Sequence, residues 1–188
     1  MKKLIGLTRL LLLGLLCIPA GAQADYFRNN YVFGVSILQQ YADLSAEFRG
    51  SASESGSGIE IYLDKYIKHQ YRLKTSLGYI KHDSFDITQF MLAGDYLIPL
   101  KTTMSAFVGL SIGTASQKYH DASLSDSATG SVYGAQAGVI TYLSDDYLIE
   151  FGLRLRQASI TTVIDTTPAN STTIDSLNEG YISLLFMF

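Results

Sequence analysis

Two short segments of the chain bring together the three side-chain types that nucleophilic catalysis requires. His82-Asp83-Ser84 supplies an imidazole, a carboxylate and a hydroxyl, and His120, Asp121 and Ser123 repeat this combination. A hydroxyl becomes a nucleophile when an imidazole removes its proton and a carboxylate orients that imidazole. Neighbouring residues of one loop rarely reach this geometry, and Ser and Asp are also ordinary loop residues. The catalytic interpretation therefore stands beside a simpler one, in which both segments are solvated loops.

The composition argues against most other kinds of chemistry. The chain has 3 His and 1 Cys, spaced too widely for a metal cluster, and its loop carboxylates are too scattered for a calcium motif. A formal net charge of −3 disfavours a nucleic-acid partner, because phosphate binding requires a basic surface. We interpret His69 as structural, and residues 50–58, rich in Ser and Gly, as a flexible loop. We therefore predict no metal, no cofactor and no nucleic acid.

The first 24 residues have the parts of a secretory signal peptide. Residues 2–9 carry the basic side chains, residues 10–18 form an apolar run, and small residues precede the end of the segment at Ala24. The apolar run is too short to cross a bilayer. We predict cleavage of residues 1–24, which leaves 25–188 as the mature domain. A retained membrane anchor, or a lipoprotein attached at Cys17, is the alternative.

The mature chain alternates between apolar and polar residues. In residues 149–156, I-E-F-G-L-R-L-R, one parity is apolar and the other carries charges or Gly. Strict alternation over such lengths indicates strands with two unlike faces. Eight such segments lie near residues 30–44, 58–65, 70–81, 87–98, 104–116, 131–143, 147–157 and 178–188.

The connections between these segments alternate in length. Long polar connections lie near 45–57, 117–130 and 158–177, with a shorter one at 81–86, whereas those at 65–69, 99–103 and 144–146 are tight. Alternating short turns and long loops between antiparallel strands are typical of membrane barrels. We therefore predict an all-β fold, an eight-stranded antiparallel transmembrane up-and-down β-barrel.

The two faces of the strands favour a membrane barrel over a soluble one. Small residues such as Gly34, Gly78 and Gly138 gather on the polar face, where they suit a narrow lumen better than a solvated exterior. Aromatic residues lie at both ends of the apolar face, which predicts two aromatic girdles around an aliphatic band. A soluble lipocalin-like barrel is the alternative.

Charged residues on the polar face then point into the lumen. This predicted set comprises Glu60, Arg72, Lys74, Asp95, Glu150, Arg154, Arg156 and Glu179. An unpaired charge inside a protein is costly, so we expect a hydrogen-bonded network of ion pairs. A turn centred near Ile67 would place Glu60 opposite Lys74, and Glu179 would meet Arg154 or Arg156. The alternative is a narrow pore whose network rearranges to pass small ions.

The last ten residues, E-G-Y-I-S-L-L-F-M-F, resemble the C-terminal assembly signal of bacterial outer-membrane proteins. The residues that would form it share one face, and they are Ile182, Leu184, Phe186 and Phe188. Two further segments, F-V-G-L-S-I-G (107–113) and residues 133–156, resemble small barrels of the OmpA transmembrane-domain, OmpX and opacity-porin type. This resemblance implies a monomer in a Gram-negative outer membrane, with both termini periplasmic. Its implied partners are outer-membrane lipid, lipopolysaccharide and the barrel assembly machinery.

The resemblance leaves the function open, because this fold hosts several. We expect a non-enzymatic structural or adhesion-type surface protein with no catalytic residue. Its loops at 117–130 and 158–177 would extend their strands as hairpins and bind an extracellular ligand, for example through an exposed strand edge. The alternative for these loops is that they are solvated and bind no partner. One alternative is a lipid A-modifying enzyme, either a deacylase or an acyltransferase, that uses the His, Ser and Asp segments. The second alternative is a narrow passive ion channel.

Overall fold

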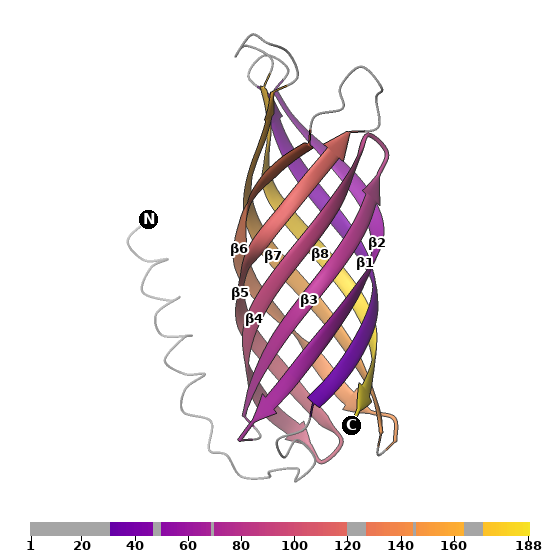
Figure 1. The fold of residues 1–188 in the computed structure, drawn as a ribbon. Coiled ribbons are helices and arrows are strands. Elements are labelled where there is room, and N and C mark those ends of the chain that lie inside the picture. The colour runs from indigo at the N-terminus through magenta and orange to yellow at the C-terminus, as the bar shows by residue number, and fades with distance from the viewer. Residues whose placement is uncertain (1–30, 47–49, 69, 120–126, 145, 164–170) are drawn as a thin grey trace, which may run out of the picture.

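The protein forms one closed sheet. The computed structural model describes residues 31–46, 50–68, 70–119, 127–144, 146–163 and 171–188. Its strands are β1 (Tyr31–Ala46), β2 (Gly50–Ile67), β3 (Tyr71–His82), β4 (Phe85–Lys101), β5 (Met104–Tyr119), β6 (Ser127–Tyr142), β7 (Tyr147–Val163) and β8 (Ser171–Met187). Each strand pairs antiparallel with the next, and β1 pairs with β8 to close the barrel (Figure 1). The predicted fold class is confirmed.

The barrel has two unlike ends. The connections after β2, β4 and β6 lie at one end, which also holds the start of β1 and the C-terminus and is called the turn end (Figure 1). The connections after β1, β3, β5 and β7 lie at the other end, called the loop end. The backbone N–H of Phe188 donates to the carbonyl of Tyr31 at 3.1 Å, which ties the two terminal strands together. Among the described residues, no helix is long and apolar enough to cross a membrane.

The outer face carries an apolar band bounded by aromatic rings. Near the turn end Tyr31 and Tyr71 are exposed, and Tyr71 packs edge-on against Tyr96. Toward the loop end Tyr41 and Tyr133 are exposed in the same way. Aliphatic side chains fill the zone between them, and their exposure would be costly in water but is favourable in lipid. They include Val35, Ile37, Ile61, Leu77, Val108, Leu110, Leu153 and Leu184.

Several strands are longer than the alternation predicted. Residues 50–58, predicted as a flexible loop, form the first half of β2 and pair with β1 from Ala46 to Leu38. The prediction was wrong because Ser and Gly are poor strand formers in isolation, whereas a ladder to β1 stabilises their extended backbone. The strands also extend into the predicted loops. In loop 117–130, β5 continues to Tyr119 and β6 begins at Ser127, and in loop 158–177, β7 continues to Val163 and β8 begins at Ser171.

Some predictions fall outside the described residues. They concern the leader at 1–24, His69 in the turn after β2, and the candidate set of His120, Asp121 and Ser123. The tips of the two long loops, 120–126 and 164–170, also lie there.

Candidate functional site: the barrel lumen and the loop end

All eight charged residues predicted to face inward are buried inside the barrel, and none is more than 3% exposed. Toward the turn end the network centres on Arg72, whose guanidinium lies 2.7 Å from the Asp95 carboxylate and 3.3 Å from that of Asp64. Arg72 also pairs with Glu150, which accepts a further bond of 2.9 Å from Lys74. One carboxylate balances the charge of a guanidinium but cannot accept all five of its N–H donors, so several buried carboxylates surround Arg72.

A second group lies further toward the loop end. Arg154 forms a two-pronged contact with Glu60, with its Nη2 at 2.6 Å and its Nη1 at 3.0 Å from the carboxylate oxygens. Glu179 accepts from Arg154 at 3.0 Å and from Arg156 at 2.9 Å. Paired N–H donors of this kind fix both the distance and the orientation of a carboxylate. The second group therefore connects β2, β7 and β8 across the lumen, and the first group connects β2, β3, β4 and β7.

The predicted pairing of Glu60 with Lys74 is wrong. The turn after β2 is centred near residue 69 rather than Ile67, so Glu60 lies opposite Gly78 and Lys74 lies opposite Asp64. Moving the turn centre by two residues moves the partner of Glu60 by four, which keeps every side chain on its own face but changes its cross-strand neighbour. The predicted contact of Glu179 holds for both Arg154 and Arg156.

The prediction missed several lumen residues. Asp64 shares the face of Glu60, so the alternation itself could have identified it. Gln40 lies in a strand whose two faces are both partly apolar, and no such signal marks it; its amide donates to Glu179 at 2.7 Å. The Tyr181 hydroxyl donates to Glu150 at 2.6 Å, although Tyr is equally common on the lipid face.

Glycines make room for the aromatic rings that enter the lumen. Gly138 lies directly opposite Phe107 in the ladder, and Gly152 lies opposite Tyr181. A Cβ atom at Gly138 would lie 2.6 Å from Cζ of Phe107. Because these rings lie flat against glycine backbone, they do not fill the centre of the lumen, and the charged side chains occupy that space. The same rings receive cations, with Arg154 at 3.9 Å from the centre of Tyr181.

Apolar layers close the network at both ends. Near the turn end the inward side chains of Val32, Leu97, Leu148 and Leu185 are fully buried or nearly so. Near the loop end the corresponding residues are Ile80, Phe85, Ile87, Ile160, Ile174 and Leu177. Between these layers, the buried charges of the described residues are five carboxylates and four cations. Such a lumen is a packed polar core, as expected when eight strands enclose little more than their own side chains.

The candidate set His82-Asp83-Ser84 is not assembled as a catalytic triad. His82 is buried in the lumen, where its Nε2 lies 3.0 Å from Oε1 of Gln40 and its ring stacks on Phe85. Ser84 is exposed in the connection to β4, and its backbone N–H donates to Glu54 at 2.7 Å. Among the described residues, no group of His, Cys, Asp or Glu could hold a metal ion.

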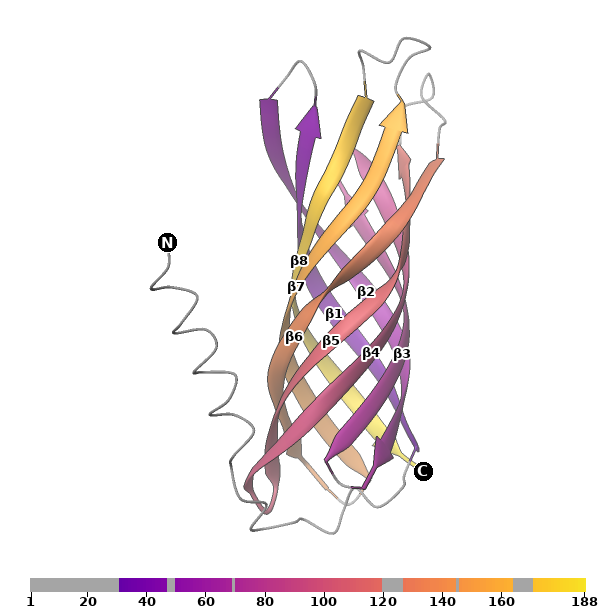
Figure 2. The same ribbon diagram turned by 90° about the vertical axis from the view of Figure 1, so that its left-hand side faces the viewer.

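The loop end contains a strand edge that the sequence did not reveal. β2 pairs with β1 from Gly50 to Lys65, but it pairs with β3 only from Gly56 onward, because β3 ends at His82. In the part of the chain that the structure describes, residues 50–55 therefore have β1 as their only strand neighbour. Figure 2 shows β1 and β2 projecting at the loop end.

The ladder identifies which backbone groups face this edge. The N–H of Leu97 donates to the carbonyl of Gln70, so even-numbered residues of β3 bond to β4 and odd-numbered ones to β2. By the same alternation, odd-numbered residues of β2 point toward β3. Ser51, Ser53 and Ser55 thus direct their N–H and C=O groups to the side where β3 has already ended.

The four residues that resemble a C-terminal assembly signal lie on the outer face of the barrel, along β8 and just after it. Ile182, Leu184 and Phe188 are exposed, and Phe186 is half-buried against Tyr147, with ring centres 5.3 Å apart. β8 is thus an apolar strand on its outer side, and it closes the barrel against β1.

Comparison with known proteins agrees with this geometry. A family model described as "Outer membrane protein beta-barrel domain" matches residues 10–182, whereas no curated protein matches the sequence. Neisserial surface protein A is 15% identical, with a TM-score of 0.64, over 83% of this chain and 97% of that chain. OprH of P. aeruginosa is 18% identical (TM-score 0.55, 86% and 100%), and Ail, the attachment invasion locus protein of Yersinia pestis, is 10% identical (0.52, 86% and 100%). At such identities the likeness to solved structures concerns the fold alone. The family model, however, spans nearly the whole chain, and the chain therefore belongs to the outer membrane protein beta-barrel domain family.

Proposed function

We propose that this outer-membrane barrel is a non-enzymatic surface protein of adhesion type, which binds an extracellular partner at its loop end. The lumen supports this indirectly. Its charges are paired with one another and lie between apolar layers, an arrangement that favours a role in the stability of the barrel over one in a pore or a reaction. The names of two structural neighbours, an attachment invasion locus protein and a surface protein, point in the same direction.

The observation that carries the proposal is the free edge of β2 at residues 50–55. An extended segment of a partner can add a strand to such an edge, because main-chain hydrogen bonds supply the affinity. Proteins usually protect exposed edges with charged side chains or Pro. Here the edge carries Ser51, Ala52, Ser53 and Ser55. Its one charged side chain, Glu54, accepts a hydrogen bond from the backbone N–H of Ser84. The edge is thus left open to a strand partner.

A polar surface at the loop end, on the other side of β1 from this edge, offers further contacts. Above the outer aromatic girdle, β7 and β8 carry Thr161 and Thr173, whose hydroxyls lie 3.1 Å apart, and Ser176, which donates to Asp43. The predicted ligand surfaces at 117–130 and 158–177 remain part of the proposal as the continuation of these strands. The proposal also includes that the barrel is a monomer and lies among outer-membrane lipid and lipopolysaccharide.

The proposal includes a route to the membrane. Residues 1–24 would direct export in a Gram-negative bacterium and be removed. The assembly machinery would then recognise the C-terminal signal of Ile182, Leu184, Phe186 and Phe188.

Replacing Ser53 with Pro is expected to abolish adherence while the barrel stays folded. Pro removes an N–H that faces the free edge and breaks no bond to β1. The measurement is the binding of bacteria that display the protein to a monolayer of cultured epithelial cells. The matched control is Ser53→Thr, which keeps the N–H and a hydroxyl and should adhere like the wild type.

Either of two results would contradict the proposal. One is adherence of Ser53→Pro at the level of Ser53→Thr, with both proteins folded as judged by the mobility of unheated samples on SDS gels. The other is wild-type adherence no higher than that of cells carrying an empty vector.

A further inference from the structure

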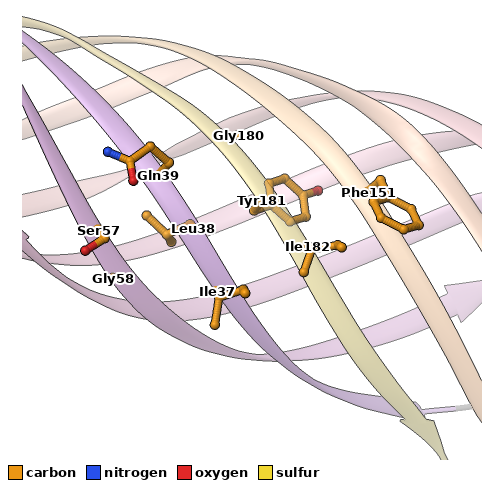
Figure 3. A pocket seen from close by; sticks show the side chains of 9 residues that line it. All are labelled: Ile37, Leu38, Gln39, Ser57, Gly58, Phe151, Gly180, Tyr181 and Ile182. Atoms are coloured by element: carbon orange, nitrogen blue, oxygen red, sulfur yellow. The ribbon is translucent and has the colours of Figure 1, made fainter.

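A groove lies on the outer wall of the barrel, over the seam where β8 closes on β1. Its volume is about 670 Å³, and it reaches from Ser57 on β2 across β1 and β8 to Phe151 on β7 (Figure 3). The exposed side chains of Ile37, Ile182 and Phe151 form its apolar part. The groove therefore faces the membrane rather than the lumen or the solvent.

The groove lies in the half of the membrane nearest the loop end. Gln39 lines it and stands two residues before Tyr41, a member of the outer aromatic girdle on the same face of β1. Rings of this kind mark the depth of the lipid headgroups. The part of the groove next to Gln39 is thus at the level where acyl chains join their headgroup, and the apolar part runs toward the bilayer centre.

Gln39 is a polar group in an apolar band. Its side chain is exposed, and the structure gives its amide no hydrogen-bond partner within the described residues. An amide in contact with lipid that lacks a partner costs free energy. A carbonyl of an acyl linkage at this depth would accept a hydrogen bond from that amide. The Ser57 hydroxyl, also exposed at this end of the groove, offers a second polar contact.

The groove exists because β8 has no side chain at Gly180. Gly180 lies between Gln39 and Leu153 in the ladder, on the outward face of the strand. A Cβ atom there would meet only Leu153, whose Cδ2 would lie 3.6 Å away, an ordinary contact. Unlike the glycines of the lumen, Gly180 makes room for nothing within the described part of the protein. A larger side chain would fill the groove without displacing the wall.

We propose that this groove binds one acyl chain of lipopolysaccharide from the outer leaflet. The chain would lie along Ile37, Ile182 and Phe151, with its linkage carbonyl at the Gln39 amide. Lipopolysaccharide is the occupant to which the geometry points, because the groove opens in the outer half of the membrane. This site is independent of adhesion through β2.

The test is native mass spectrometry of the protein extracted from outer membranes in a mild detergent. The wild type should retain one lipopolysaccharide molecule, identified by its mass. Gly180→Leu should reduce the retained fraction about tenfold, because the side chain occupies the volume of the acyl chain. The matched control is Gly94→Leu, since Gly94 also faces outward, from β4, with only Leu73 near its Cβ, at 4.0 Å. This control should retain the lipid.

A second variant separates binding from folding. Gln39→Leu places an apolar side chain in the lipid band, so the barrel should become no less stable in urea while retention falls. Equal retention by the wild type, Gly180→Leu and Gly94→Leu would overturn the proposal. A retained molecule with the mass of a phospholipid would overturn it as well. Folding of each variant is checked by the mobility of unheated samples on SDS gels.

Discussion

Replacing Arg154 with Met is expected to lower the free energy of unfolding by about 3–5 kcal/mol. Arg154 is 1% exposed, holds Glu60 by two hydrogen bonds and shares Glu179 with Arg156. Met has a similar length but no charge, so Glu60 would be left buried without a cation. The measurement is urea unfolding in lipid vesicles, followed by the gel mobility of unheated samples.

A double mutant distinguishes the free energy lost with the ion pair from the free energy lost with side-chain packing. Combined with Arg154→Met, Glu60→Gln should recover about 2 kcal/mol, because the stranded charge has been removed. The control is Lys65→Ala: Lys65 reaches the Tyr31 hydroxyl at 2.7 Å near the surface of the barrel, and its loss should cost about 1 kcal/mol or less. An Arg154→Met variant as stable as Lys65→Ala would show that the lumen is hydrated rather than sealed.

Replacing Gly138 with Ala is expected to destabilise the barrel by about 3 kcal/mol, although it adds a single methyl group. The new Cβ would meet the backbone carbonyl of Phe151 and would lie 2.6 Å from Cζ of Phe107. Phe107 cannot easily move, since the Arg72 guanidinium lies 4.5 Å from its ring centre. The backbone carbonyl cannot move without breaking the ladder between β6 and β7.

The matched change is Gly94→Ala on the outer face of β4, where the new Cβ has ordinary contact with Leu73. This variant should be neutral, or more stable by about 0.5–1 kcal/mol, because Ala restricts the unfolded chain. Both variants are compared in the same urea titration. Equal stabilities for the two would contradict the assignment of Gly138 to a crowded lumen and Gly94 to the lipid face.

The fold could be predicted because its signals are local. A period of two in residues 149–156 states which side chains point inward, whatever their partners are. The burial of Glu150, Arg154 and Arg156 follows from that parity alone. The predicted alternation of short and long connections favoured the correct up-and-down order, but it was wrong for the first half of the chain. There β1 ends at Ala46 before β2 begins at Gly50, and β3 ends at His82 before β4 begins at Phe85.

The pairs within the lumen could not be predicted in the same way. They depend on the ladder register, which a turn of unknown length shifts, as it did for Glu60 and Lys74. Glu60 meets Arg154 from across the barrel, 94 residues further along the chain, and no local pattern encodes that distance. The free edge of β2 also escaped prediction. It arises because β3 ends at His82 while β2 begins at Gly50, and the Ser- and Gly-rich composition there resembles a loop.

The most direct test of a sealed polar lumen is the reactivity of single cysteines in intact cells. Cys17 is the only cysteine of the chain, so it is replaced by Ser in every variant. Ser36→Cys lies in the lumen at a position that is 1% exposed, and Ser45→Cys lies on the outside near the loop end of β1. A membrane-impermeant maleimide should label Ser45→Cys and leave Ser36→Cys unmodified until the protein is unfolded in urea. Labelling of Ser36→Cys in the folded protein as fast as that of Ser45→Cys would mean a water-filled lumen and would contradict this account.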